Sequence, residues 1–134
     1  MGIEIKNLVM EYKKGIKSLN HINLTIEHGI YGLLGENGAG KTTLMKILVT
    51  LLTPTKGEVK INGLKLEKKN YEAIKKRIGY LPQELGLYPN MTVRESLEYV
   101  GIMCGMGKKT YTRQIDFYLK RTGLLEHQHK KNKQ

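Results

Sequence analysis

The chain has 134 residues, enough for one small domain, and its longest apolar stretches are far too short to cross a bilayer. Apolar and charged residues alternate over the first nine positions, a pattern that is not expected of a signal peptide. A single cysteine, Cys104, excludes an internal disulfide and suits the reducing cytoplasm.

The net charge is +11, with lysine and arginine pairs spread along the whole sequence. A basic surface can attract nucleic acid or anionic lipid. Here the pairs are scattered, and aromatic residues are not interleaved with them as they are in single-strand binders. The composition therefore predicts a solvated basic surface and does not favour a nucleic-acid partner.

The first half of the chain reads as strands followed by a helix. Residues 3–12 alternate apolar with charged residues and predict a strand, and a second strand is centred on Leu24 and Ile26. The apolar run 30–34 predicts a buried strand. Residues 43–52 place leucines and isoleucine at helical spacing, and the threonine and proline that follow end this helix.

The middle of the chain continues the alternation of strand and helix. Residues 58–61 predict a strand that turns at Asn62-Gly63, and residues 71–77 predict a short helix. Residues 78–81 are apolar and predict another buried strand, which stops at Pro82.

The last third is predicted to be helical. Thr92 and Glu95 have the spacing of a capping box and predict a helix to about residue 103. Residues 110–121 predict a second helix that ends at Gly123. The polar residues 126–134 are expected to fray.

A phosphate-binding motif lies between the predicted strand 30–34 and the helix that follows it. Residues 35–43 read G-E-N-G-A-G-K-T-T and satisfy the P-loop pattern G-x-x-x-x-G-K-[ST]. Glycines let successive N–H groups turn inward on an anion, and the helix adds the free amides and positive dipole end of its N-terminus. The motif in this context predicts binding of a nucleoside triphosphate.

The residues of the motif have distinct expected roles. Lys41 would reach the β- and γ-phosphates, the Thr42 hydroxyl would ligate Mg²⁺, and Thr43 would bond the α-phosphate. The other loop residues assigned to nucleotide binding are Gly35, Asn37, Gly38, Ala39 and Gly40. Glu36 and Asn37 occupy variable loop positions, and neither is assigned a catalytic role.

Four segments together resemble the ATP-binding cassette (ABC) ATPases. Residues 32–44 resemble the Walker A segment of that family, and residues 54–59 resemble its P-T-x-G-x-[IV] strand. Residues 78–83 are similar to its Q-loop, and residues 87–95 to the segment after it. The resemblance covers nearly the whole chain, and it looks closest to the ATP-binding subunits of multidrug or antibiotic exporters.

The resemblance implies an α/β fold of incomplete extent. Residues 1–88 would form a P-loop NTPase core of the ABC type with an N-terminal antiparallel β-subdomain. Residues 89–126 would form the start of a helical subdomain, and residues 127–134 a polar tail. Tyr12 resembles the A-loop aromatic that stacks on adenine. Gln83 resembles the catalytic glutamine that senses the γ-phosphate, Mg²⁺ and the attacking water.

The same resemblance implies the molecules with which the chain would act. These are ATP and Mg²⁺ as cofactors, a transmembrane permease subunit, and a second ATP-binding cassette. The implied location is the cytoplasm, peripheral at the inner face of the cell membrane.

The sequence also departs from the family pattern. It has no L-S-G-G-Q signature, and no strand after Gln83 ends in adjacent acids. The only aspartate, Asp116, lies within a predicted helix, and His127 and His129 lie in the polar tail. Because phosphoryl transfer needs a positioned metal and an oriented water, we expect the isolated chain to bind nucleotide weakly with negligible hydrolysis.

Two alternatives to a transporter subunit stay open at this point. The chain could be a soluble ABC-type ATPase that acts on ribosomes or DNA, which the basic charge favours slightly. It could also be a non-functional truncated product. Co-purification with a membrane protein would support the transporter, and salt-sensitive binding of nucleic acid would support the ribosome or DNA alternative.

Overall fold

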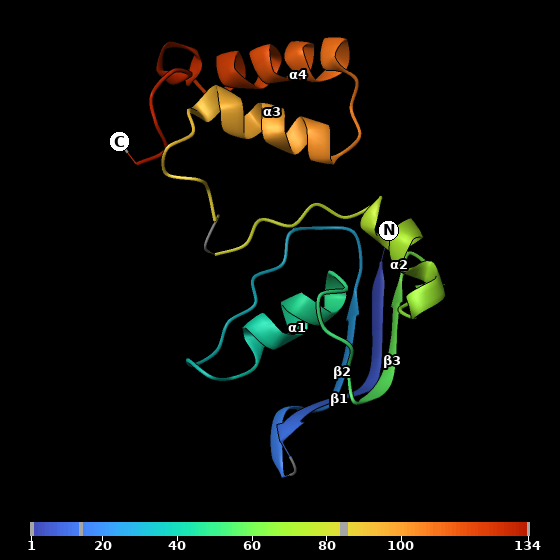
Figure 1. The fold of residues 1–134 in the computed structure, drawn as a ribbon. Helices are drawn as coiled ribbons and strands as arrows, with labels where there is room; N and C mark the ends of the chain where they lie inside the picture. Colours follow the sequence, from blue (N-terminus) through green and yellow to red (C-terminus); the bar gives the residue numbers. More distant parts are fainter. Residues whose placement is uncertain (1, 14, 84–85, 134) are drawn as a thin grey trace. The chain divides into compact units, whose positions relative to one another are not determined.

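The computed structural model describes residues 2–13, 15–83 and 86–133. The chain divides into two compact units, residues 1–80 and 81–134, which are considered separately (Figure 1). The first unit contains β1 (Ile3–Lys13), β2 (Ile16–Ile26), α1 (Lys41–Leu48), β3 (Lys56–Ile61), β4 (Leu64–Lys65) and α2 (Tyr71–Lys75). The second contains α3 (Val93–Met103) and α4 (Lys108–Arg121). None of the described helices is both long and apolar enough to span a membrane.

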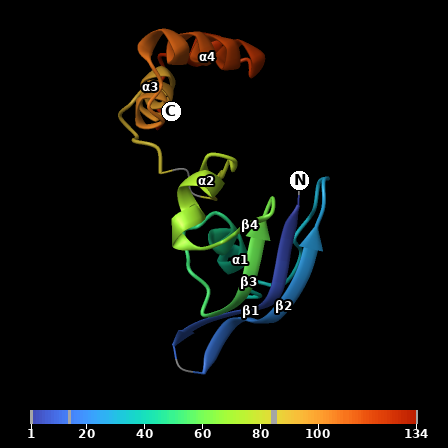
Figure 2. The same ribbon diagram turned by 90° about the vertical axis from the view of Figure 1, so that its right-hand side faces the viewer.

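The first unit is built on a four-stranded antiparallel sheet with the strand order β2-β1-β3-β4. Ile3 lies opposite Ile26 of β2 on one side and opposite Ile61 of β3 on the other. Helix α1 packs on one face of this sheet, as the two views in Figures 1 and 2 show. The antiparallel β-subdomain expected from the sequence is therefore present.

The register of the long β1–β2 pair shifts at four points between Ile5 and Lys13. Asn7 and His21 both have positive φ, 49° and 52°, and the pairing shifts register between Ile5 and Leu8. Each bulge adds a residue to one strand and resets which side chains face the core. Strict alternation is lost, which is why the sequence pattern did not show that β2 begins as early as Ile16.

The core of the first unit lies between the sheet and helix α1. Leu8 of β1 and Ile47 of α1 are both 0% exposed, and Ile74 of α2 is 1% exposed. Burial of such side chains is worth about 2 kcal/mol each. The other buried members of this cluster are Ile5, Met10, Leu19, Leu44, Leu48, Val59 and Ile61.

Helix α1 is shorter than predicted at its C-terminal end. The sequence predicted residues 43–52, but the helix ends at Leu48 because Thr50 takes a positive φ of 63°. The Thr50 amide donates to the Ile47 carbonyl and the Leu51 amide to the Lys46 carbonyl, at 2.9 Å each. These two bonds form a Schellman motif, which satisfies carbonyls of the last turn and stops the helix.

Two predicted strands do not form. Residues 30–34 and 78–81 have no strand structure, and none of the described residues pairs with them. Ile30 is fully exposed and Leu34 is 92% exposed. A run of apolar residues indicates a tendency to be buried, but a strand needs a neighbour to accept its backbone hydrogen bonds. The prediction of these two strands is wrong for the structure described.

The second unit is a pair of helices, α3 and α4, that pack on each other, with Gly101 of α3 close to the Tyr111 side chain of α4. Ile115 and Leu119 of α4 are buried. The capping box at the start of α3 is confirmed: the Thr92 amide donates to the Glu95 carboxylate at 2.7 Å, and the Glu95 amide donates to Thr92 Oγ1 at 3.2 Å. These bonds hold the pKa of Glu95 below its ordinary value, because they favour the ionised carboxylate.

The expectation of a frayed polar tail is wrong. The amides of Val93 and Arg94 donate to the carbonyls of Lys130 and Gln128, at 3.1 and 3.0 Å. The Asn132 side chain donates to Ser96 Oγ at 2.7 Å. The first amides of a helix have no partner within the helix, so the tail carbonyls satisfy groups that would otherwise need water.

Asp116 takes part in a network of side chains within the second unit. Its carboxylate pairs with the guanidinium of Arg94, whose Nε also donates to the Gln128 side chain at 2.6 Å. This network links α4, the start of α3 and the tail within the second unit.

Candidate nucleotide-binding site

The glycine-rich loop, residues 35–40, leads from the exposed segment 30–34 into helix α1. Gly38 and Gly40 both have φ of 88°, in the left-handed region that favours glycine. The Ala39 amide donates to the Glu36 carbonyl at 3.2 Å and closes a tight turn between them. The loop is therefore curved, as the motif predicted.

Strand β2 supports the loop from behind at Gly40. A methyl group on Gly40 would lie 2.3 Å from the Ser18 carbonyl oxygen and 2.8 Å from a Leu19 methyl carbon. Only glycine allows the loop to approach the strand this closely. Sequence reasoning missed this support because the bulge at His21 hid the start of β2 from the alternation pattern.

The first turn of α1 has backbone hydrogen-bond donors without an acceptor. Within the described residues, the amides of Gly40, Lys41 and Thr42 donate to no protein acceptor, and the helical ladder begins with Leu44 donating to Gly40 at 2.9 Å. Open amides and the positive end of the helix dipole together favour an anion. The loop and this turn can bind phosphate.

The Lys41 side chain folds back over the loop that precedes it. Its ammonium donates to the carbonyls of Gly35 and Glu36, at 2.6 and 2.7 Å. An ammonium has three N–H donors, so one stays available to a ligand oxygen. The contacts fix a positive charge at the start of the glycine-rich loop.

The two threonines after Lys41 have different surroundings. The Thr42 side chain is exposed at the first turn and makes no hydrogen bond to any described residue, so its hydroxyl is free to ligate a cation. Thr43 is buried, and its Oγ1 lies 3.2 Å from the hydroxyl of Tyr12. No cluster of three or more His, Cys, Asp or Glu side chains occurs among the described residues, so a metal here would depend on hydroxyl, phosphate and water oxygens.

Tyr12 reaches the loop region from β1 across a sequence separation of 31 residues. The residue is 55% exposed, while its hydroxyl lies 3.2 Å from Thr43 Oγ1. The structure thus brings together the predicted adenine-stacking residue and a predicted phosphate ligand. An exposed ring held at one end presents a surface on which a base can stack.

Two other predicted residues gain no contact from the structure. Asn37 is exposed in the loop, and its side chain makes no hydrogen bond to a described residue. Gln83 is exposed and belongs to residues 81–134, a different unit from the loop. The roles assigned to both residues stay predictions that rest on the sequence.

Comparison with known proteins decides the family. A family model described as ABC transporter matches residues 19–134. The chain belongs to the ABC transporter ATP-binding family. The ABC transporter ATP-binding protein NatA of Bacillus subtilis is 38% identical over 121 residues, which are 89% of this chain and 49% of NatA. The bacitracin transport ATP-binding protein BcrA of Bacillus licheniformis is 41% identical over 116 residues, 86% of this chain and 36% of BcrA.

A solved ABC structure confirms the fold class. The ATP-binding cassette MJ0796, in a dimeric post-hydrolysis state bound to ADP and Pi, matches with a TM-score of 0.81 and 28% identity. The match covers 98% of this chain and 62% of that one. The ABC chain described here therefore spans about half the length of NatA and less than two thirds of MJ0796. Its fold is part of an α/β P-loop cassette of the ABC type.

Proposed function

We propose that this chain binds Mg-ATP as part of the ATP-binding subunit of an ABC transporter. The observation that carries the proposal is the pairing, in a chain of this family, of unpaired amides at the first turn of α1 with a Lys41 ammonium held on the glycine-rich loop. The MJ0796 cassette, a relative in fold, was captured with ADP and Pi. The glycine-rich loop and the unpaired amides at the start of α1 are suited to bind the polyphosphate of ATP.

The residues present also fit a magnesium ion. Thr42 offers an exposed, unengaged hydroxyl at the helix start, and Mg²⁺ commonly takes one or two protein oxygens together with phosphate oxygens and waters. When bound, the ion neutralises charge on the phosphates. Gln83 is proposed to contribute on the γ-phosphate side, on the strength of its place in the Q-loop segment.

We further propose that these 134 residues alone do not hydrolyse ATP at a useful rate. The sequence has neither an L-S-G-G-Q segment nor an Asp-Glu pair after Gln83, and its single aspartate is paired with Arg94. Loss of such transition-state stabilisers costs about a hundredfold or more for each group. Lys41 and the loop amides would bind and orient the polyphosphate without activating a water.

The direction of transport, the partners and the cellular location of the subunit are proposed from its relatives. BcrA is named for bacitracin transport, and resemblance to antibiotic and multidrug exporters favours export as the direction. The proposed partners are a transmembrane permease and a second cassette, as MJ0796 forms a dimer. The proposed location is the cytoplasmic face of the membrane.

The test of this function measures binding and turnover separately. Calorimetric titration of the purified chain with ATP is expected to show binding that weakens when EDTA removes Mg²⁺. Phosphate release is expected to stay at the background rate. Absence of ATP binding by a folded chain would refute the proposed function, and turnover well above background would refute the statement on hydrolysis alone.

Two variants of Tyr12 separate base stacking from the contact of its hydroxyl with Thr43. Tyr12→Ala removes the ring and is expected to weaken ATP binding about tenfold, since base–aromatic stacking is worth about 1–3 kcal/mol. Tyr12→Phe keeps the ring and is expected to retain most of the ATP affinity. Inorganic triphosphate has no base, so its affinity should change equally in the two variants. Equal ATP affinities of the alanine and phenylalanine variants would contradict the stacking role.

A further inference from the structure

Helix α4 has an aromatic surface on the side that faces away from its buried residues. Ile115 and Leu119, one helical turn apart, are buried. Phe117, the only phenylalanine of the chain, lies midway between them in the sequence, so its side chain points to the opposite side of the helix. Phe117 is 56% exposed and Tyr118 beside it 54% exposed. Two aromatic rings are therefore exposed side by side.

Exposed cations surround Phe117. Residues 109, 113, 117 and 121 follow one another at intervals of four and so form a single stripe along the helix. Neither Arg113 nor Arg121 has an ion pair or a side-chain hydrogen bond with any other described residue. The stripe and the lysine beside it are called the outer face of α4, which consists of Lys109, Arg113, Phe117, Lys120 and Arg121.

The stability of the helix does not account for all of these charges. Helix α4 begins with Lys108 and Lys109, and its first turn has neither an acidic residue nor a side-chain cap. Cations at this end are locally unfavourable, because the helix dipole is positive there. The only acid in the helix, Asp116, is paired with Arg94 and does not neutralise the outer face. A departure from local preference is expected where a surface has a function.

The rings and one guanidinium lie around a common hollow. Its volume is about 300 Å³, and it is lined by Arg113, Gln114, Phe117 and Tyr118. The rings of Phe117 and Tyr118 pack edge to face, with centroids 5.3 Å apart. The outer face therefore presents N–H donors for an oxyanion and an apolar ring at the same place.

This combination matches the boundary between the headgroups and the acyl chains of an anionic membrane. At that boundary an aromatic ring enters the apolar layer, while lysine and arginine bind the headgroup phosphates. A nucleic acid would satisfy the cations, but a single strand is bound in a groove that follows its backbone, and the outer face is the convex side of one helix. Charge complementarity and the exposed ring together favour lipid.

We propose that the outer face of α4 docks on the anionic phospholipid surface of a membrane. Phe117 enters the boundary of the acyl chains, and the four cations bind headgroup phosphates. The proposal extends the membrane location proposed above, and it does not depend on the glycine-rich loop, which lies in the first unit.

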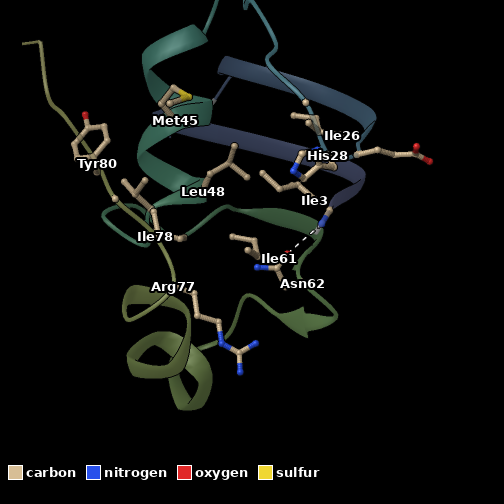
Figure 3. Close-up of a pocket in the computed structure, with 15 residues that line it drawn as sticks. Ile3, Ile26, His28, Met45, Leu48, Ile61, Asn62, Arg77, Ile78 and Tyr80 are labelled. Atoms are coloured by element: carbon tan, nitrogen blue, oxygen red, sulfur yellow. Dashed lines mark hydrogen bonds between the residues drawn. The ribbon is translucent and has the colours of Figure 1, made fainter.

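The first unit offers lipid a second route that does not depend on charge. It has a largely apolar groove of about 510 Å³, and Figure 3 shows Ile26 on one side of it, Ile78 on the other and Leu48 of α1 between them. Such a groove can take up acyl chains whatever the charge of the headgroup. Vesicle binding by itself therefore does not test the outer face of α4, and a probe at Phe117 is needed.

The test places a fluorescent residue on the outer face of the full 134-residue chain. The sequence has no tryptophan, so Phe117→Trp gives a single reporter. Its emission is expected to move to shorter wavelength with vesicles of phosphatidylcholine and phosphatidylglycerol in equal parts, and not with phosphatidylcholine alone. Tyr99→Trp, on α3, is the matched control and should show no shift. Absence of the shift at Phe117, or an equal shift at Tyr99, would overturn the proposal.

A double variant tests the cations. Arg113→Gln with Arg121→Gln is expected to weaken binding to the anionic vesicles roughly thirtyfold at low ionic strength. Lys46→Gln with Lys75→Gln removes the same charge from exposed positions of the first unit and should weaken it less than about threefold. Equal losses would overturn the proposal.

Two further measurements separate this surface from other functions. Quenching of the Phe117→Trp emission by a single-stranded oligonucleotide, without a shift on anionic vesicles, would assign the outer face to nucleic acid and overturn the proposal. ATP titration of the double arginine variant should match that of the parent chain, which keeps this result distinct from a failure of the proposed function.

Discussion

Replacing Lys41 with alanine is expected to weaken Mg-ATP binding about 100-fold or more, equivalent to about 2.7 kcal/mol. The ammonium would donate charge-assisted hydrogen bonds to phosphate oxygens, and each such bond contributes about 1.5–3 kcal/mol. The same ammonium holds the carbonyls of Gly35 and Glu36, so its loss also loosens the loop. Isothermal titration calorimetry measures the change directly.

Lys46→Ala is the matched control for this prediction. Lys46 lies in the last turn of the same helix, is exposed, and its replacement removes the same unit of charge. Its ATP affinity should fall by less than about threefold, because an exposed charge far from the ligand is screened. If the two variants lose the same affinity, general charge attraction explains binding and the assignment of Lys41 is wrong.

Replacing Gly40 with alanine is expected to disrupt both the loop and the strand behind it. The new methyl group would lie 2.3 Å from the Ser18 carbonyl oxygen, so either the loop or β2 must move. Overpacking costs about 1–3 kcal/mol, and the left-handed φ of 88° adds about 1–2 kcal/mol for any residue with a Cβ. We expect the free energy of unfolding to fall by about 3 kcal/mol and ATP binding to be lost.

Gly38→Ala isolates the backbone contribution from the steric one. Gly38 has the same φ of 88° as Gly40, but a methyl group there would meet no atom within 4 Å. We expect only the conformational cost, about 1–2 kcal/mol, in denaturant unfolding followed by circular dichroism. Similar losses in the two variants would show that contact with β2 does not support the loop.

Sequence reasoning succeeded where the evidence is local. The capping box of Thr92 and Glu95 forms as predicted, and α4 ends just before Gly123, which has the positive φ of 71° expected after a helix. The P-loop curvature follows from glycines within a few residues of one another. Each of these features depends on bonds between near neighbours, so the residue order is sufficient to specify them.

Sequence reasoning failed where a segment needs a distant partner. Residues 30–34 and 78–81 are apolar enough to be strands, but the described chain gives them no strand to pair with. The polar tail lacks any hydrophobic pattern, yet its carbonyls accept from the first amides of α3. The hydrophobicity of a segment does not predict either kind of pairing. Every residue except proline carries the same backbone N–H donor and C=O acceptor, whatever its side chain.

The sequence by itself determined the family and the chemistry of the loop, since the glycines, Lys41 and the threonines are contiguous and act through their own backbone and side chains. Only the tertiary structure brought Tyr12 to Thr43, 31 residues away, and placed the Ser18 carbonyl against Gly40. Both contacts depend on the register of β1 and β2, which shifts at four points between Ile5 and Lys13. A bulge depends on the backbone angles of one or two residues, which the packed sheet stabilises. It therefore interrupts the alternation of apolar and polar residues without a sequence pattern of its own.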